Sequence, residues 1–149
     1  MKLVVQRCKM GNVVINNKVN GKVDVGFVIL VGFTHGDNEL IIDKMIDKLI
    51  HLRIFEDENE KMNKSILDVN GTILSISQFT LYANCKEGRR PSFNLAMKAD
   101  EASKLYDIFN EKLNKYVHTE TGIFGSDMQV TLQNDGPVTI ILDSEELFK

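Results

Sequence analysis

The stretch FVILV at residues 27–31, bounded by Gly26 and Gly32, decides the fold. A strand with one wet face would alternate apolar and polar residues. This uninterrupted apolar run therefore predicts a short strand that is buried on both faces. Such a strand belongs in the middle of a sheet, so the segments before and after it should supply its neighbours and a covering layer.

Strand-forming residues precede this central strand. LVVQR at 3–7 predicts an opening strand. The segment 12–25 alternates short β-branched pieces with two turn signals, Asn16-Asn17 and Asn20-Gly21. Residue pairs of this kind favour tight turns because they tolerate positive φ. We therefore expect hairpins before the central strand.

Two amphipathic helices follow it. Asp37 is a suitable N-cap for a helix over about 38–52, and an apolar stripe at helical spacing predicts a second helix over about 100–116. Between them, residues 56–64 are polar and typical of a loop, and TILSIS at 72–77 predicts another buried strand.

The chain is expected to end with two short strands, 128–134 and 138–143, joined by a turn at Asp135-Gly136-Pro137. Proline is poorly tolerated in a central strand because it cannot donate to the ladder. About seven strands and two main helices, mostly linked by short turns, predict an α+β fold with a mainly antiparallel sheet. No composition break divides residues 1–149, so a single domain is expected.

The composition excludes several classes of protein. The chain has 149 residues, of which 43% are apolar and 26% charged, and its net charge is −3. These values are typical of one globular domain without disorder. No apolar stretch approaches the roughly 20 residues of a membrane span, and no signal peptide is present, so we expect a cytoplasmic protein. Two cysteines and three scattered histidines lack zinc spacing, so no metal or cofactor is expected.

Four stretches could carry chemistry: SQFT at 77–80, KEGRRPSF at 86–93, TGIFGSDMQV at 121–130 and NDGPVT at 134–139. The first ends a buried strand with hydroxyl and amide groups, where a pocket can open, and the second is a basic cluster in an acidic chain. Each stretch also fits an ordinary role in a strand, loop, core or turn. Neither a GxSxG elbow nor a glycine-rich phosphate loop occurs.

Six stretches together resemble the D-aminoacyl-tRNA deacylases, in the order of that family and over nearly the full chain. They are VVQR (4–7), LRIFED (52–57), SQFTLYA (77–83), GRRPSF (88–93), FGSDMQV (124–130) and NDGPVT (134–139). The resemblance implies a small, barrel-like α+β subunit that works as a homodimer. It also implies hydrolysis of the ester between a D-amino acid and the 3′ end of tRNA, with glycyl-tRNA mischarged on tRNA-Ala as a further substrate.

The resemblance also implies a pocket for the aminoacylated terminal adenosine. The catalytic segment beside the ester would be Ser77, Gln78, Phe79 and Thr80. The residues near the adenosine would be Phe124 and Met128. Phosphate contacts with tRNA would come from Lys86, Arg89 and Arg90. The same resemblance matches Gly136 and Pro137 to a Gly-cisPro motif, whose backbone reaches into the partner subunit's pocket and blocks the side chain of an L-amino acid.

Three functional questions stay open at this point. Thr80 is a candidate nucleophile, but no residue offers an obvious base, so we favour attack by water with help from the neighbouring RNA hydroxyl. The fold could instead bind tRNA without turnover. A trans Gly136-Pro137 bond would admit small L-amino acids and shift the chiral preference.

Overall fold

The central strand lies where FVILV predicts it. The computed structural model describes residues 1–149, and in it β3 (Gly26–Gly32) is buried along nearly its whole length. β3 pairs antiparallel with β1 (Lys2–Ile15) and parallel with β6 (Thr72–Ser77). The order of strands in the sheet is β2-β1-β3-β6-β7, with β8 on β1.

β1 is longer than the predicted strand at 3–7, because it continues through the first half of the expected hairpins. The chain turns at Asn16-Asn17, where both residues have positive φ, into β2 (Lys18–Val23). The second expected turn, at Asn20-Gly21, is wrong because both residues lie inside β2. A Cβ at Gly21 would lie 3.1 Å from the Thr121 carbonyl oxygen, so this glycine permits close strand packing instead.

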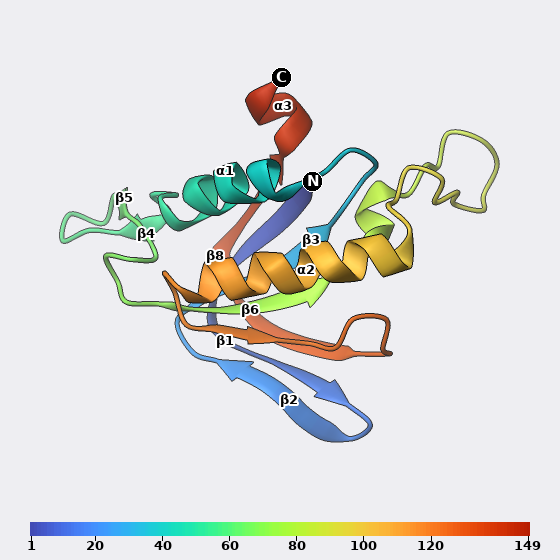
Figure 1. Cartoon of the computed structure of the whole chain (residues 1–149). Helices are drawn as coiled ribbons and strands as arrows, with labels where there is room; N and C mark the ends of the chain where they lie inside the picture. Colours follow the sequence, from blue (N-terminus) through green and yellow to red (C-terminus); the bar gives the residue numbers. More distant parts are fainter.

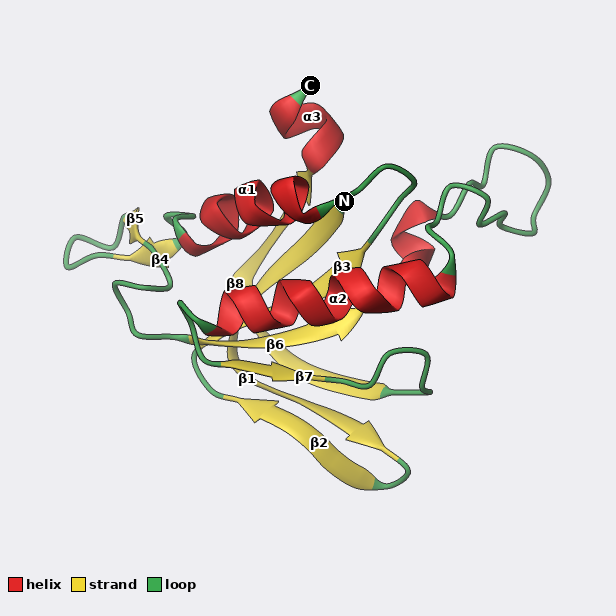
Figure 2. Ribbon diagram, in the orientation of Figure 1, coloured by secondary structure: helices red, strands yellow, loops and turns green.

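Two long helices lie on one side of the curved sheet (Figures 1 and 2). α1 (Glu39–Ile50) follows β3, and α2 (Ala99–Asn114) connects β6 to the parallel strand β7 (Thr119–Thr121). Apolar residues of both helices pack with one face of β1, β3 and β6 in the main core. A smaller core fills the other face, inside the curl of β1 and β2.

The N-cap of α1 is Asn38 and not Asp37. The Asn38 side chain accepts the Ile41 N–H at 3.2 Å. The Asp37 carboxylate is occupied elsewhere: it accepts the Thr34 N–H and pairs with the Met1 ammonium, each at 2.7 Å. Asp37 therefore ties the start of β1 to the loop after β3.

The polar segment at 56–64 is more ordered than a loop. β4 (Phe55–Glu56) and β5 (Met62–Lys64) form a separate two-stranded ribbon at its ends. A short 3₁₀ helix, η1 (Phe79–Tyr82), follows β6, and a short helix, α3 (Ser144–Phe148), ends the fold. No helix has the length and apolar character that crossing a membrane requires.

The last strand overturns the prediction of two strands joined by a turn. β8 (Gln129–Asp143) is continuous, and both of its halves pair antiparallel with β1. Gln6 pairs with Thr139 and Cys8 with Asn134, so the four residues between them on β8 face only Arg7. The Gly136–Pro137 bond, which is cis, lies in this bulge. A bulge absorbs the extra residues without reversing the chain.

The fold class is α+β with a barrel-like sheet, as predicted. Antiparallel pairs join β1 to β2, β3 and β8, whereas β3–β6 and β6–β7 are parallel, so the sheet is mixed. The parallel pairs form because a helix follows β3 and another follows β6. Each connection carries the chain back to the end of the sheet at which the preceding strand began, so the next strand runs in the same direction.

Candidate active site

A groove of about 590 Å³ opens where β6 ends. Its polar end carries Ser77, Gln78 and Phe79. Its other walls come from the start of α2 and from the loop between β7 and β8, and they are mostly apolar. The main apolar side chains are those of Phe33, Met97, Ala102, Phe124, Met128 and Val130.

The polar end forms because β6 stops abruptly. The Gln78 N–H donates to the Val31 carbonyl at 2.8 Å, after which the chain enters η1. The chain leaves the extended conformation after Ser77, so the side chains of Phe79 and Thr80 do not alternate between two faces as they would in a strand. A Cβ at Gly32 would lie 3.0 Å from the Gln78 carbonyl oxygen, so the glycine leaves room for this turn.

The η1 turn presents several hydrogen-bonding groups. The first N–H groups of a helical turn have no partner within it, and no side chain caps η1. The Gln78 amide donates to the Thr80 hydroxyl, which lies outside the groove lining. The groove can therefore offer a ligand a hydroxyl, an amide and backbone donors.

No side-chain base faces this groove. Lys98 is the single titratable side chain in its lining. His35 interacts with the Asn94 carbonyl oxygen at 2.9 Å, and His118 lies 3.2 Å from the Glu120 carboxylate, both away from the groove. No group of three or more His, Cys, Asp or Glu side chains gathers where a metal could bind. The groove is suited to binding and to stabilising an oxyanion.

Tyr106 of α2 packs against Phe124 and supports this wall of the groove. The two rings lie 5.9 Å apart between centroids. The Tyr106 hydroxyl donates to the Ser75 carbonyl at 2.8 Å, and the Gly122 N–H donates to the same oxygen at 3.2 Å. Burial raises the pKa of Tyr106, so the phenol stays neutral and keeps its proton to donate. The sequence pattern indicated only a core residue here.

Gly136 and Pro137 do not line the groove of their own chain and are exposed on β8. The bulge around them is held by Arg7, which is only 6% exposed. Arg7 donates to the Ile54 carbonyl at 2.7 Å and to the Asp135 carbonyl at 3.3 Å. Sequence reasoning missed this role, although a charge in the apolar strand LVVQR was a signal.

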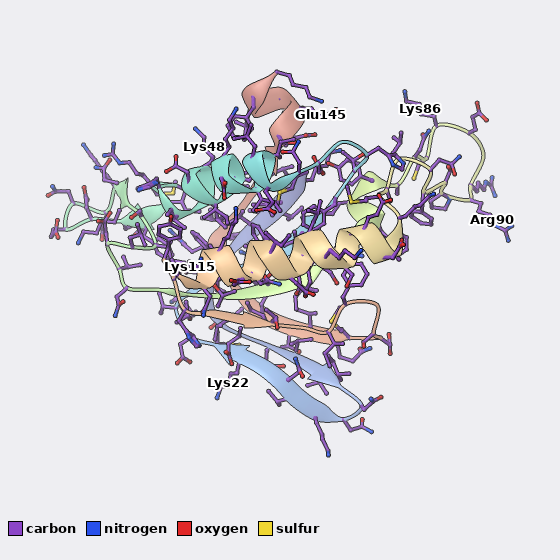
Figure 3. All side chains as sticks on the ribbon, viewed as in Figure 1. Lys22, Lys48, Lys86, Arg90, Lys115 and Glu145 are labelled. Carbon is purple, nitrogen blue, oxygen red and sulfur yellow. The ribbon has the colours of Figure 1, made fainter.

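The basic loop stands apart from the barrel. Lys86, Arg89 and Arg90 are exposed, and Figure 3 shows Lys86 and Arg90 pointing outward from it. None of the three forms an ion pair within the chain. Asn84 and Ser92 close the loop with two backbone hydrogen bonds, of 2.7 and 2.9 Å. The structure thus gathers Ser77, Gln78, Phe79, Phe124 and Met128 in one groove and leaves the other candidates outside it.

Comparison with known proteins gives a consistent set of relatives. A family model described as D-Tyr-tRNA(Tyr) deacylase matches residues 4–143. A D-aminoacyl-tRNA deacylase of Thermus aquaticus is 52% identical over 147 residues, which cover 98% of this chain and 97% of the relative. A protein of the same name from Sulfurihydrogenibium sp. is 54% identical over 144 residues, with 97% and 98% covered.

Two solved structures share the fold. A protein described as a c-Myc DNA unwinding element binding protein superposes with a TM-score of 0.91 at 39% identity, covering 96% of this chain and 98% of that chain. A probable eukaryotic D-amino acid tRNA deacylase superposes with a TM-score of 0.82 at 17% identity, covering 95% and 97%. The second likeness, at this low identity, concerns the fold alone.

We expect Arg7→Met to loosen the bulge at 135–138, because the carbonyl and the carboxylate of Asp135, each 3.3 Å from the Arg7 Nε, lose a charged donor. Amide hydrogen exchange at Gly136 and Val138 should quicken at least about tenfold, and the free energy of unfolding should fall by about 1–3 kcal/mol. Lys9→Met is the control, since the Lys9 ammonium lies 4.0 Å from the Asp135 carboxylate but is 63% exposed. If the two changes had equal effects, any nearby positive charge would hold the bulge, and the buried hydrogen bonds of Arg7 would not be the cause.

Proposed function

This chain belongs to the D-Tyr-tRNA(Tyr) deacylase family and is a D-aminoacyl-tRNA deacylase, and we propose that the groove at the end of β6 is its active site. One observation carries this proposal: the groove joins hydrogen-bonding groups of Ser77, Gln78 and η1 to mostly apolar walls, and its volume of about 590 Å³ has room for a nucleoside. The substrate is the ester that links a D-amino acid to the 3′ end of tRNA. The products are the free D-amino acid and tRNA.

The terminal adenosine would occupy the apolar part of the groove. Phe124 and Met128 would contact its base, because an aromatic face and a polarizable thioether both suit a flat heterocycle. Ser77 and Gln78 would then lie beside the ester. The N–H groups of Phe79 and Thr80 would face the carbonyl oxygen, where negative charge develops.

Water is the proposed nucleophile. It adds to the ester carbonyl, the C–O bond to the ribose breaks, and the ribose oxygen takes a proton as it leaves. The neighbouring ribose hydroxyl would assist the proton transfer, since the groove lining holds no carboxylate or imidazole. The enzyme's contribution is to position the ester and to stabilise the oxyanion.

Chiral selection would come from a second copy of the chain. Gly136 and Pro137 are exposed and lie outside their own groove, and β8, which pairs only with β1, leaves its outer edge open. A homodimer could use that edge and place the Gly136-Pro137 backbone in the partner's groove. There it would exclude an L side chain by steric clash. Glycine has no side chain to exclude, so glycyl-tRNA mischarged on tRNA-Ala would also be cleaved.

The rest of the tRNA would be held by charge. Lys86, Arg89 and Arg90 are exposed and unpaired, and phosphate contacts of this kind position a nucleic acid without reading its sequence. Such an enzyme would act in the cytoplasm, where aminoacyl-tRNA is made and used.

The proposed function is tested by comparing hydrolysis of D-tyrosyl-tRNA and L-tyrosyl-tRNA by the purified protein, with an N-blocked ester and free tRNA as controls. We expect the D ester to be cleaved and the L ester to be untouched. Cleavage of neither ester would support a binding protein. Cleavage of both would show that nothing excludes an L side chain.

Gly136→Ala should weaken chiral selection. Gly136 has a φ of +118°, and an added Cβ would lie 2.9 Å from a Val138 methyl carbon, so the bulge must move. We expect the ratio of D to L cleavage to fall at least about tenfold, the result of losing roughly 1.4 kcal/mol of discrimination. Gly36→Ala is the control, because Gly36 also has positive φ but has open space around it. An unchanged ratio of D to L cleavage in Gly136→Ala would show that the bulge takes no part in chiral selection.

Thr80→Ala tests the nucleophile. If water attacks, kcat should stay within about tenfold of the parent value, because a lost hydrogen bond to Gln78 costs only about 0.5–1.5 kcal/mol. Thr80→Ser, which keeps the hydroxyl, should match the parent. Complete loss of turnover in Thr80→Ala, with tRNA still bound, would identify the Thr80 hydroxyl as the nucleophile instead.

A further inference from the structure

Two phenylalanine rings are exposed at the groove. Phe79 is 54% exposed and Phe93 is 38% exposed, and both belong to the groove lining. Their centroids are 5.0 Å apart and their planes meet at 69°. Single exposed apolar side chains are common on protein surfaces, but two aromatic rings in edge contact at one groove form a larger apolar patch, in which a planar ligand can stack on one ring and meet the other at its border.

This aromatic pair is held at the base of the basic loop. Phe93 directly follows Ser92, whose two hydrogen bonds with Asn84 close that loop. The Phe93 carbonyl also accepts the Ala96 N–H at 3.0 Å, so the backbone is fixed on both sides of the ring. Phe79 begins η1, next to the polar end of the groove. The pair therefore lies between the proposed ester site and the loop.

The charge around the pair favours a nucleic acid. The loop carries Lys86, Arg89 and Arg90 against a single acidic residue, Glu87, within a chain of net charge −3. Lys98 adds another cation to the groove lining. Aromatic faces beside cations are the combination that binds single-stranded RNA, since bases stack on the rings while phosphates meet the charges.

We propose that Phe93, in edge contact with Phe79, is a stacking platform for the penultimate base of the tRNA 3′ end, a role that rests on the proposed function of the groove. The terminal adenosine would fill the groove, and the nucleotide before it would leave past the two rings toward the basic loop. Stacking accepts any base, so this contact would add affinity without selecting among tRNAs.

Esters of increasing length test the platform. The parent protein, Phe93→Ala, Phe93→Leu and Phe93→Tyr would be assayed on three D-tyrosyl esters: adenosine, cytidylyl-adenosine and full tRNA. Phe93 is chosen over Phe79 because it lies outside the proposed catalytic segment. Phe93→Leu keeps an apolar side chain without an aromatic face, and Phe93→Tyr keeps the face.

The parent should show a lower KM for the cytidylyl-adenosine ester than for the adenosine ester. Phe93→Ala and Phe93→Leu should raise KM for the two longer esters about tenfold, the loss expected for one stacked base. KM should rise far less for the adenosine ester, which has no penultimate base, although Phe93 also lines the groove, and for all three esters the change should fall on KM more than on kcat. Phe93→Tyr should behave like the parent.

The salt dependence of KM for tRNA distinguishes the contribution of the aromatic rings from that of the cations of the basic loop. In Arg90→Gln, the slope of log KM for tRNA against log salt concentration should fall by about 0.7, the value for one lost contact to a single strand. In Phe93→Ala that slope should be unchanged while KM is higher at every salt concentration. A reduced slope in Phe93→Ala would overturn the platform, because the ring would then act by placing the cations.

Other outcomes also overturn the inference. An equal rise of KM for all three esters in Phe93→Ala would show that the ring contacts the adenosine and not the penultimate base. If KM rose for none of the esters, the ring would have no part in substrate binding. A change in the sedimentation mass of Phe93→Ala would show that a second subunit covers the ring. Failure of the parent on all three esters would instead overturn the proposed function itself.

Discussion

The parallel pairing of β3 with β6 is the constraint on which the rest of the structure depends. It sets Val31 opposite Ser77, and the bond from the Gln78 N–H to the Val31 carbonyl ends the ladder. β3 is buried on both faces, so a shift of one residue would move its side chains into the wrong core. The register therefore decides where η1 begins, and so where the groove has its hydrogen-bonding groups.

Much of the fold could be predicted from local patterns. Continuous apolar residues indicated β3, and helical spacing indicated α1 and α2, because burial on one or two faces leaves a period in the sequence. The two halves of β8 were also indicated, but their continuity through Gly136 and Pro137 left no such signal. Gly136 and Pro137 favour a turn locally, and only the length of β1, which both halves of β8 pair with, keeps the chain straight.

The site was less accessible to sequence reasoning. SQFT, Phe124 and Met128 were placed by resemblance, since hydroxyl and amide groups at a strand end have ordinary explanations too. Arg7 and Tyr106 were missed as supports because their partners, Asp135 and Ser75, are distant in the sequence. The supporting roles of a charged residue in an apolar strand and of a tyrosine on a helix core face can be recognised only when their hydrogen-bond partners are known.

The pairing of β1 with β8 has a consequence for biosynthesis. β1 leaves the ribosome long before β8, the strand that covers one of its edges along nearly its full length. Until then, that edge is an unpaired template for other extended chains. Closure depends on contacts between distant segments, which form slowly. We therefore expect the nascent chain to need protection until β8 has been made, and chains truncated before β8 to aggregate.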